Sequence, residues 1–375
     1  MKKRQKPMGK RTPWVWSIEF TRGCNLACWH CTARIFPEDG NPRFMSVETF
    51  TEMCKVMNAI TPHTRLELAQ GGEPTLNPNL YECLGLVRRL TPTTQVQVTT
   101  NGLTLLAGKV TYRDLFAAGA HSVYVDMYGQ KEKHIEMAKA SGAEWYKYNE
   151  PRVGTENHKM ANTYYGDPDM KLVILQDSPE YRLRWRNEGR LSTFLNHMDW
   201  NVSMPYGLIP VREPYARKCT MPMRYVSISH EGDYLFCCID FWCETAGQMG
   251  NVRDGVEGFT EYWFGLLMQS IRRRLSLGER ASVPYCSRCN CAFSKCDWIG
   301  IWPPHSFDWW WKDNEWSEMP PLDGKEETAV FDEGWQWASK TGEALPSIEH
   351  EIKVLNESDK RIIKSTAAIR KRVTR

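Results

Sequence analysis

Three cysteines, Cys24, Cys28 and Cys31, follow one another at the spacing C-x3-C-x2-C, directly after an apolar, strand-like run over 14–20. Three thiolates on one loop can hold three irons of a cubane iron–sulfur cluster and leave the fourth iron without a protein ligand. A structural zinc site uses four protein ligands, so three cysteines are an odd number for it. We therefore favour a reactive iron–sulfur centre over surface cysteines on a loop.

Strand-like and helical segments alternate along the first half of the chain. The expected strands are 14–21, 66–69, 95–100 and 121–126, and the expected helices are 46–59, 79–90, 112–118 and 130–140. Such alternation is typical of parallel βαβ units, and polar motifs follow each strand at the edge where α/β barrels carry active sites. Less regular strands at 144–148, 171–176 and 201–204, with a helix at 180–196, complete an α/β domain that fits a partial (β/α)6 barrel.

The length and composition indicate a globular protein with one large domain and a smaller one. The chain has 375 residues, of which 42% are apolar and 25% charged. Apolar runs are too short to span a membrane, and the basic N-terminus has no apolar segment of a secretory signal behind it. Thirteen cysteines at ligand-like spacings in such a chain indicate a reduced, cytoplasmic location.

Charge is unevenly distributed although the net charge is only +3. Residues 1–11 carry six Lys or Arg and no acid, and residues 360–375 carry seven and no acid. Such basic tails on an acidic body could contact nucleic acid. Basic tails are more often simply solvated, and we retain both interpretations.

The sequence composition changes near residue 214, and this change suggests a domain boundary. Cysteines become dense there, and short expected strands at 224–229 and 234–238 flank the hairpin turn 230–233. We predict a basic lead-in at 1–13, a core domain at 14–213 and a small cysteine-rich domain at 214–300. A tryptophan-rich segment and a charged helical tail follow at 301–375. Its tryptophans could stack on bases, but packing against the barrel is the safer interpretation.

The first cysteine motif resembles that of the radical S-adenosylmethionine (SAM) superfamily, with His30 in the position before the last cysteine that is often aromatic. The resemblance implies that Cys24, Cys28 and Cys31 ligate a [4Fe-4S] cluster whose open iron is chelated by SAM. One electron from the cluster would then cleave SAM to methionine and a 5'-deoxyadenosyl radical, which abstracts hydrogen from the substrate. His30 would lie near the adenine.

Two further motifs follow the second and third expected strands. Gly71, Gly72 and Glu73 begin the run GGEP, in which glycines allow close approach of backbone to a ligand and the carboxylate can accept hydrogen bonds from an ammonium group. By resemblance this motif binds the SAM amino group, and a plain Gly-Gly-Pro turn is the alternative. Thr100 and Asn101 end the third strand, where the family holds the SAM ribose, although Asn-Gly turns are common.

Asp126 and Tyr128 lie at the end of the fourth expected strand. Many members of the family carry a Ser-x-Asp segment at this position. This chain departs from that pattern because Tyr124 occupies the small-residue position. We expect Asp126 or Tyr128 to bind substrate or to transfer a proton, with plain helix capping as the alternative.

A second group of cysteines resembles the SPASM domain of the same superfamily. Cys219 is followed after twelve residues by Gly232, after four more by Cys237, and later by Cys286 and Cys289 at C-x2-C. The resemblance implies that the four cysteines ligate an auxiliary [4Fe-4S] cluster. Four thiolates also describe a zinc site, and the residues alone do not choose between the two. The presence of the cysteine motif at 24–31 favours an iron–sulfur cluster over zinc at these four cysteines.

The remaining cysteines are harder to assign. The C-terminal half contains four more, Cys238, Cys243, Cys291 and Cys296, which could serve a second auxiliary cluster. The run from 286 to 296 lacks the family's Cys-x2-Cys-x5-Cys-x3-Cys spacing, so we expect one auxiliary cluster. Cys54 and Cys83 lie on expected helix faces and are interpreted as buried apolar residues.

The combined resemblance covers about residues 14–300 and implies a radical SAM enzyme with a flavodoxin or ferredoxin as reductant. SPASM members mostly modify peptides or protein side chains, so we expect a peptide or amino-acid-type substrate. The basic tails and tryptophans favour an alternative, the modification or rearrangement of an aminoacyl-type group on a nucleobase in viral DNA. A non-catalytic iron–sulfur electron carrier or zinc-bound scaffold would bind no SAM and would not need Glu73.

Overall fold

The computed structural model describes residues 13, 15–26, 39–61, 64–68, 70–147, 169–177, 219, 221–238, 240, 243 and 245–287. An eight-stranded sheet runs through this part of the chain in the order β10-β9-β1-β4-β5-β6-β8-β7. Its strands are β1 (Val15–Ile18), β4 (Arg65–Leu68), β5 (Gln95–Thr100), β6 (Ser122–Met127), β7 (Glu144–Lys147), β8 (Leu172–Asp177), β9 (Tyr225–Ile228) and β10 (Tyr234–Leu235). A separate pair is formed by β2 (Thr21–Arg22) and β3 (Arg43–Phe44).

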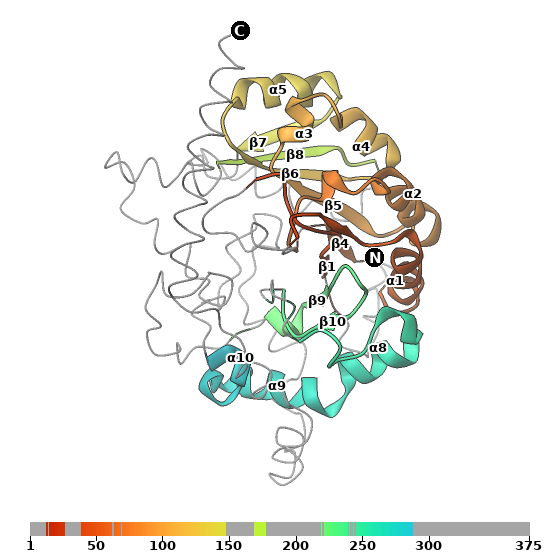
Figure 1. The fold of residues 1–375 in the computed structure, drawn as a ribbon, viewed down its shortest axis with the longest axis vertical. Helices are drawn as coiled ribbons and strands as arrows, with labels where there is room; N and C mark the ends of the chain where they lie inside the picture. Colours follow the sequence, from red (N-terminus) through yellow and green to blue (C-terminus); the bar gives the residue numbers. More distant parts are fainter. Residues whose placement is uncertain are drawn as a thin grey trace, which may run out of the picture.

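Helices lie along the outer side of this arc of strands (Figure 1). They are α1 (Val47–Ile60), α2 (Leu80–Leu90), α3 (Leu103–Leu106), α4 (Tyr112–Ala118), α5 (Lys131–Ala140), α8 (Gly255–Phe264), α9 (Leu266–Leu277) and α10 (Pro284–Ser287). The expected start of the first helix is confirmed, since the Ser46 side chain accepts a hydrogen bond from the Thr49 amide. Cys54 on α1 and Cys83 on α2 are fully buried, as predicted.

Side chains alternate between two different faces of the sheet. Trp16 faces the helices, because its indole N–H donates to Thr61 Oγ1 at the end of α1 over 2.9 Å. The opposite face is polar: Ser17 is in register with Ser227 on one neighbouring strand and with Glu67 on the other. Glu67 forms a buried ion pair with Arg65, and burial raises the pKa of Glu67 although Arg65 opposes this. One face therefore packs the core, and the other carries buried polar groups.

The strands β7 and β8 are placed in the sheet in the reverse of their order in the chain. β8 lies between β6 and β7 and pairs parallel with both. Leu172, Val173, Ile174 and Leu175 are all buried, so both faces of β8 are apolar, as an internal parallel strand requires. β7 begins and ends with charged residues, Glu144 and Lys147, and takes the edge.

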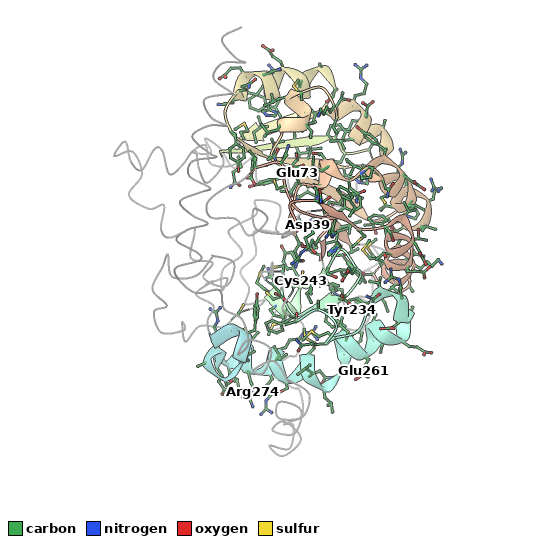
Figure 2. All side chains as sticks on the ribbon, in the orientation of Figure 1. Asp39, Glu73, Tyr234, Cys243, Glu261 and Arg274 are labelled. Atoms are coloured by element: carbon green, nitrogen blue, oxygen red, sulfur yellow. The ribbon has the colours of Figure 1, made fainter. Side chains whose placement is uncertain are left out.

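The strands of the cysteine-rich segment join the core sheet. β9 pairs parallel with β1, and β10 pairs antiparallel with β9, which confirms the expected hairpin. Aromatic rings hold α8 against these strands. Phe259 stacks on Trp16 with ring centroids 5.1 Å apart, and Tyr262 stacks on Tyr234 at 4.5 Å (Figure 2 labels Tyr234). Each such pair contributes about 0.5–1.5 kcal/mol beyond the burial of its area.

The fold is α/β with a mostly parallel sheet, as predicted. The domain boundaries stay predictions, because the sheet continues from the predicted core domain into the cysteine-rich one. The expected helix at 180–196, the strand at 201–204, the insertion at 150–168 and everything from 288 onward lie outside the described residues. Within the described part, no helix has the length and apolar character to cross a membrane.

A buried histidine makes the stability of this fold sensitive to pH. His134 on α5 is 0% exposed, and its Nδ1 lies 3.0 Å from the Tyr112 hydroxyl. Burial, with a contribution from Lys133, lowers the pKa of His134 from 6.5 to about 4. The folded state thus keeps the ring neutral while the unfolded chain takes up a proton. The associated stability is complete above pH 6.5 and is lost as the pH falls toward 4.

We expect the free energy of unfolding of the wild type to fall between pH 7 and pH 4 by up to about 3 kcal/mol more than that of His134→Gln. Urea unfolding at a series of pH values measures this difference. Tyr112→Phe is the matched control, because it removes the hydroxyl and leaves the histidine buried, so the pH dependence is retained. If the free energies of unfolding of the wild type and of His134→Gln changed in parallel with pH, the lowered pKa of His134 would be contradicted.

Candidate functional site

The predicted site residues lie in loops that follow the carboxyl ends of the parallel strands, and we call this boundary of the sheet its carboxyl edge. Cys24 lies just after β2 in the segment that follows β1, Gly71–Glu73 follow β4, and Asn101 follows β5. Cys28, His30 and Cys31 lie outside the described residues. The carboxyl ends of neighbouring parallel strands meet at one edge, so the sheet brings these loops together.

Gly72 lets the loop after β4 lie directly against the backbone that leads into Cys24. A Cβ atom at Gly72 would overlap the carbonyl oxygens of Thr21 and Gly23. The next residue strengthens the contact, since the Glu73 amide donates to Gly23 O over 2.9 Å. Gly71 has φ +76°, and a Cβ there would meet Glu19 Cγ at 3.0 Å. The double glycine is therefore required by the packing of two loops.

The Glu73 carboxylate joins the loops after β4 and β5. It is 2% exposed and accepts four hydrogen bonds. Oε1 accepts from the Thr75 amide (3.1 Å), the Thr75 hydroxyl (2.6 Å) and the Thr100 hydroxyl (2.7 Å). Oε2 accepts from the Asn101 amide (2.8 Å). Burial raises the pKa of Glu73, and the hydrogen bonds from Asn101, Thr75 and Thr100 oppose that rise. Binding of the SAM ammonium group by Glu73 stays a prediction.

Asn101 contacts the first cysteine of the motif. Its Nδ2 donates to Asn25 Oδ1 over 2.7 Å and to Cys24 Sγ over 3.5 Å. Thr100 is turned toward Glu73 and also accepts from the Gly102 amide at 3.1 Å. Both residues are thus placed beside the cysteine segment, and their predicted contact with the SAM ribose is untested.

Asp126 and Tyr128 lie one strand further along the same edge. Asp126 is in β6, in register with Gln176 of β8, and alternates with buried Val125 and Met127, which face the helices. It is therefore on the polar face of the sheet and partly exposed. Tyr128 follows directly after β6. Their catalytic role stays a prediction.

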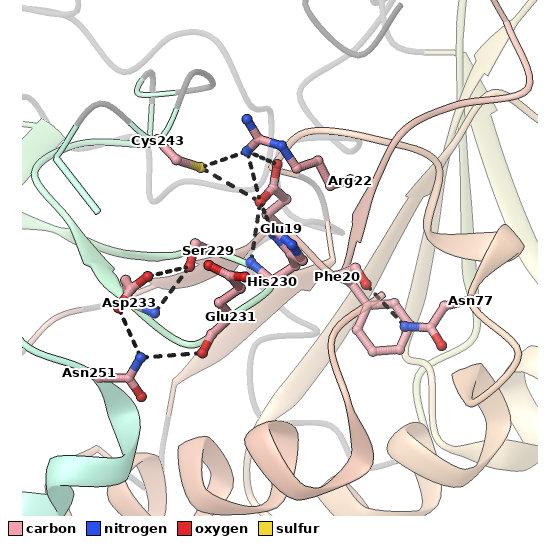
Figure 3. Close-up of polar contacts among 10 residues, drawn as sticks. All are labelled: Glu19, Phe20, Arg22, Asn77, Ser229, His230, Glu231, Asp233, Cys243 and Asn251. Carbon is pink, nitrogen blue, oxygen red and sulfur yellow. Dashed lines mark hydrogen bonds and ion pairs between the residues drawn. The ribbon is translucent and has the colours of Figure 1, made fainter. Parts of the chain in front are cut away.

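A polar cluster that the sequence motifs did not indicate joins β1 to the cysteine-rich segment (Figure 3). Glu19 Oε2 lies 2.9 Å from His230 Nδ1 and 3.6 Å from Cys243 Sγ. Arg22 Nη1 donates to Glu19 Oε1 over 3.1 Å and to Cys243 Sγ over 3.2 Å. Burial, followed by Glu19 and Asp240, raises the pKa of the Cys243 thiol well above its usual value. This cysteine, which the sequence left open for a second auxiliary cluster, thus lies within the polar cluster beside Glu19 and Arg22.

Three of the four predicted auxiliary ligands, Cys219, Cys237 and Cys286, are among the described residues, and Cys289 is not. Cys219, Cys237 and Cys286 are 5–7% exposed. A hydrogen bond with Cys237, burial, and the nearby Glu67 and Cys219 raise the pKa of Cys238. Phe236 and Tyr285, the neighbours of Cys237 and Cys286, pack edge to face with ring centroids 5.4 Å apart. Buried thiols are ligands that suit a soft metal centre, and the ligation of an auxiliary cluster by these cysteines stays a prediction.

The described ligands fit iron–sulfur clusters only in part. Among the described residues, no three or more His, Cys, Asp or Glu form a group that could hold a metal ion. Cys28, Cys31 and Cys289 are outside that set. The donor pattern does fit at Cys24, where two N–H groups, from Asn101 and Leu26, point at the sulfur. N–H donors are the expected partners of a cluster thiolate.

Comparison with known proteins matches the two cysteine segments separately. Residues 18–147 match the radical SAM superfamily, and residues 219–290 match an iron–sulfur cluster-binding domain, SPASM. A GTP 3',8-cyclase of Stenotrophomonas maltophilia (strain K279a) is 30% identical over 97 residues, which are 26% of this chain and 29% of that protein. One from Klebsiella pneumoniae subsp. pneumoniae is 27% identical over 164 residues, 39% of this chain and 49% of that protein.

The chain thus spans from less than a third to about half of the length of these curated relatives. The crystal structure of BtrN in complex with AdoMet and 2-DOIA is similar with a TM-score of 0.49 at 18% identity. That alignment covers 74% of this chain and 93% of BtrN. A likeness this distant says nothing about the substrate.

Replacement of Gly72 by alanine is expected to displace the segment that carries Cys24. The added methyl group overlaps two carbonyl oxygens, and overpacking of this kind costs about 1–3 kcal/mol. We expect the reconstituted variant to lose the iron of one cluster and to keep that of the other, as measured by iron content per chain. Gly85→Ala on α2 is the control, because its Cβ meets only the Arg89 side chain at 3.4 Å. Equal iron in both variants would contradict the packing argument.

Replacement of Glu73 by glutamine is expected to destabilise the fold by about 1–3 kcal/mol. An amide nitrogen in place of one carboxylate oxygen would face hydrogen-bond donors, either at Asn101 or at Thr75 and Thr100. Urea unfolding at neutral pH measures the loss. Glu52→Gln, in an exposed pair with Lys55, is the matched control and should change stability by less than about 0.5 kcal/mol. Equal losses of stability in the two variants would show that the hydrogen bonds to Glu73 stabilise the fold no more than an exposed ion pair does.

Proposed function

The chain combines a radical SAM domain with a C-terminal SPASM iron–sulfur domain, as its cysteine motifs predicted, and from this premise we propose that it is a radical SAM enzyme. The two domain matches imply SAM, a SAM-binding [4Fe-4S] cluster and auxiliary iron–sulfur ligation. When bound, the cluster at Cys24, Cys28 and Cys31 supplies the electron that cleaves SAM, and the resulting 5'-deoxyadenosyl radical abstracts hydrogen from a substrate carbon.

The observation that carries the proposal is the convergence of two strand-end loops, after β4 and β5, on the loop that carries Cys24. Gly72 packs on the backbone before this cysteine, and Glu73 fixes the position of Asn101. Asn101 in turn donates to the cysteine sulfur. These residues hold the ligand loop in place through contacts outside the loop itself. Asp126, partly exposed on the polar face, is the candidate for binding substrate or moving a proton.

The proposed substrate is a peptide or an amino-acid-type group, with a flavodoxin or ferredoxin as reductant. Support for the substrate comes from the SPASM match over 219–290, since members of that group mostly act on peptides or protein side chains. The cyclase relatives match only part of the chain, so their substrate is not carried over. The nucleobase alternative depends on basic tails that lie outside the described residues. The cytoplasmic location also stays a prediction.

Anaerobic reconstitution with iron and sulfide, followed by dithionite and SAM, tests the proposal. We expect 5'-deoxyadenosine to form with the wild type and to fall to background with Cys24→Ala. The buried Cys54, remote from the motif on α1, gives the control Cys54→Ala, which should retain the activity. A non-catalytic electron carrier would hold iron and produce no 5'-deoxyadenosine. That outcome would overturn the proposal.

A further inference from the structure

The orientation of the Asn101 side chain is determined by its neighbours. Its Oδ1 accepts from the Leu103 amide over 3.0 Å, at the start of α3. A backbone N–H must meet the oxygen of the amide group, so the nitrogen is at the opposite end. That nitrogen lies 2.7 Å from Asn25 Oδ1 and 3.5 Å from Cys24 Sγ. Asn101 therefore presents a donor to the sulfur and cannot be turned over without losing the bond from Leu103.

The Cys24 sulfur receives a second N–H donor. The Leu26 amide lies 3.4 Å from Sγ. As a thiol, Cys24 itself lies within 3.7 Å of Asn25 Oδ1, but a thiolate that ligates iron has no proton to donate. Asn25 Oδ1 then accepts the hydrogen bond from Asn101 Nδ2 without competition from Cys24. Two donors on one thiolate stabilise negative charge on the sulfur.

Glu73 keeps the donor in place. Its Oε2 accepts from the Asn101 backbone amide, and its Oε1 accepts from Thr100. The Gly102 amide donates to Thr100 Oγ1, so the turn is held on both sides of Asn101. Asn101 itself is 8% exposed. A buried donor on a rigid turn affects a nearby charge more strongly than one that is free to rotate in water.

We propose that Asn101 is a positioning residue that raises the reduction potential of the cluster ligated by Cys24. The inference rests on the proposed function for the presence of that cluster. A cluster gains a negative charge on reduction, and N–H donors to its thiolates stabilise the more negative state. Asn101 thereby makes the cluster easier to reduce by a protein donor. This role differs from the contact with the SAM ribose that the family resemblance implied for the same residue.

The test is an EPR-monitored redox titration of the reconstituted full chain, with the SAM-binding cluster identified by the change of its signal on addition of SAM. Asn101→Asp keeps an oxygen for the Leu103 amide, removes the donor and adds negative charge beside the sulfur. We expect its midpoint potential to be lower than that of the wild type. Asn101→Ser, which replaces the amide N–H donor by a shorter hydroxyl without adding charge, should shift in the same direction by less. Asn79→Asp, at the start of α2, makes the same charge change as a control and should leave the potential unchanged.

The possible outcomes separate this inference from the proposed function. If the wild type forms 5'-deoxyadenosine and Asn101→Asp and Asn101→Ser keep the wild-type potential, the inference is wrong and the function stands. If SAM affinity falls while the potential is unchanged, Asn101 serves the ribose and the inference is also wrong. If the wild type holds no SAM-responsive cluster, the proposed function itself fails. A lowered potential in both variants, with melting temperatures close to that of the wild type, supports the inference.

Discussion

The four hydrogen bonds accepted by the Glu73 carboxylate hold the carboxyl edge of the sheet in one arrangement. A buried carboxylate is costly unless donors surround it, and here the donors belong to the segments that must be positioned. Thr75 follows Glu73 in the chain, whereas Thr100 and Asn101 come from the next strand. Because the buried carboxylate needs these donors, the loops that carry them are held at a fixed spacing. The backbone bond from Glu73 to Gly23 extends this order to a third loop, the one that carries Cys24.

The same edge of the sheet links the two cysteine segments. β9 pairs with β1 along four residues, and the Glu19 cluster continues the contact beyond the ends of both strands. Glu19 is 2% exposed, and its carboxylate contacts Arg22 on one side and His230 on the other, so side chains of both segments hold it in place. Phe259 of α8 and Trp16 of β1 make the corresponding apolar contact on the other face. The radical SAM and SPASM segments are thus joined by polar contacts at the edge and aromatic contacts in the core.

Much of the candidate site could be predicted because its motifs are local. Gly72 and Glu73 are adjacent in the chain and follow an apolar strand, and together with the family resemblance this position indicated a site. The Glu19 cluster could not be found in this way, since Glu19 and His230 are separated by 211 residues and neither is part of a motif. A charged residue at the end of an apolar strand was the one available signal. The place of β8 between β6 and β7 was equally hidden, because strand order depends on which strand can be apolar on both faces. Asn101 was recognised, but its contact with Cys24 depends on a rotamer that a sequence pattern does not contain.

The pairing of β1 with β9 has a consequence for how the chain is made. Of the two partners of β1 in the sheet, β4 follows within about fifty residues along the chain. The other partner, Tyr225–Ile228, follows only about two hundred residues after β1, so this side of β1 has no such neighbour until that segment has been synthesised. Unpaired strand edges invite wrong partners during that interval. Assembly of the first iron–sulfur centre on a finished sheet must therefore wait for translation of the segment that carries the second.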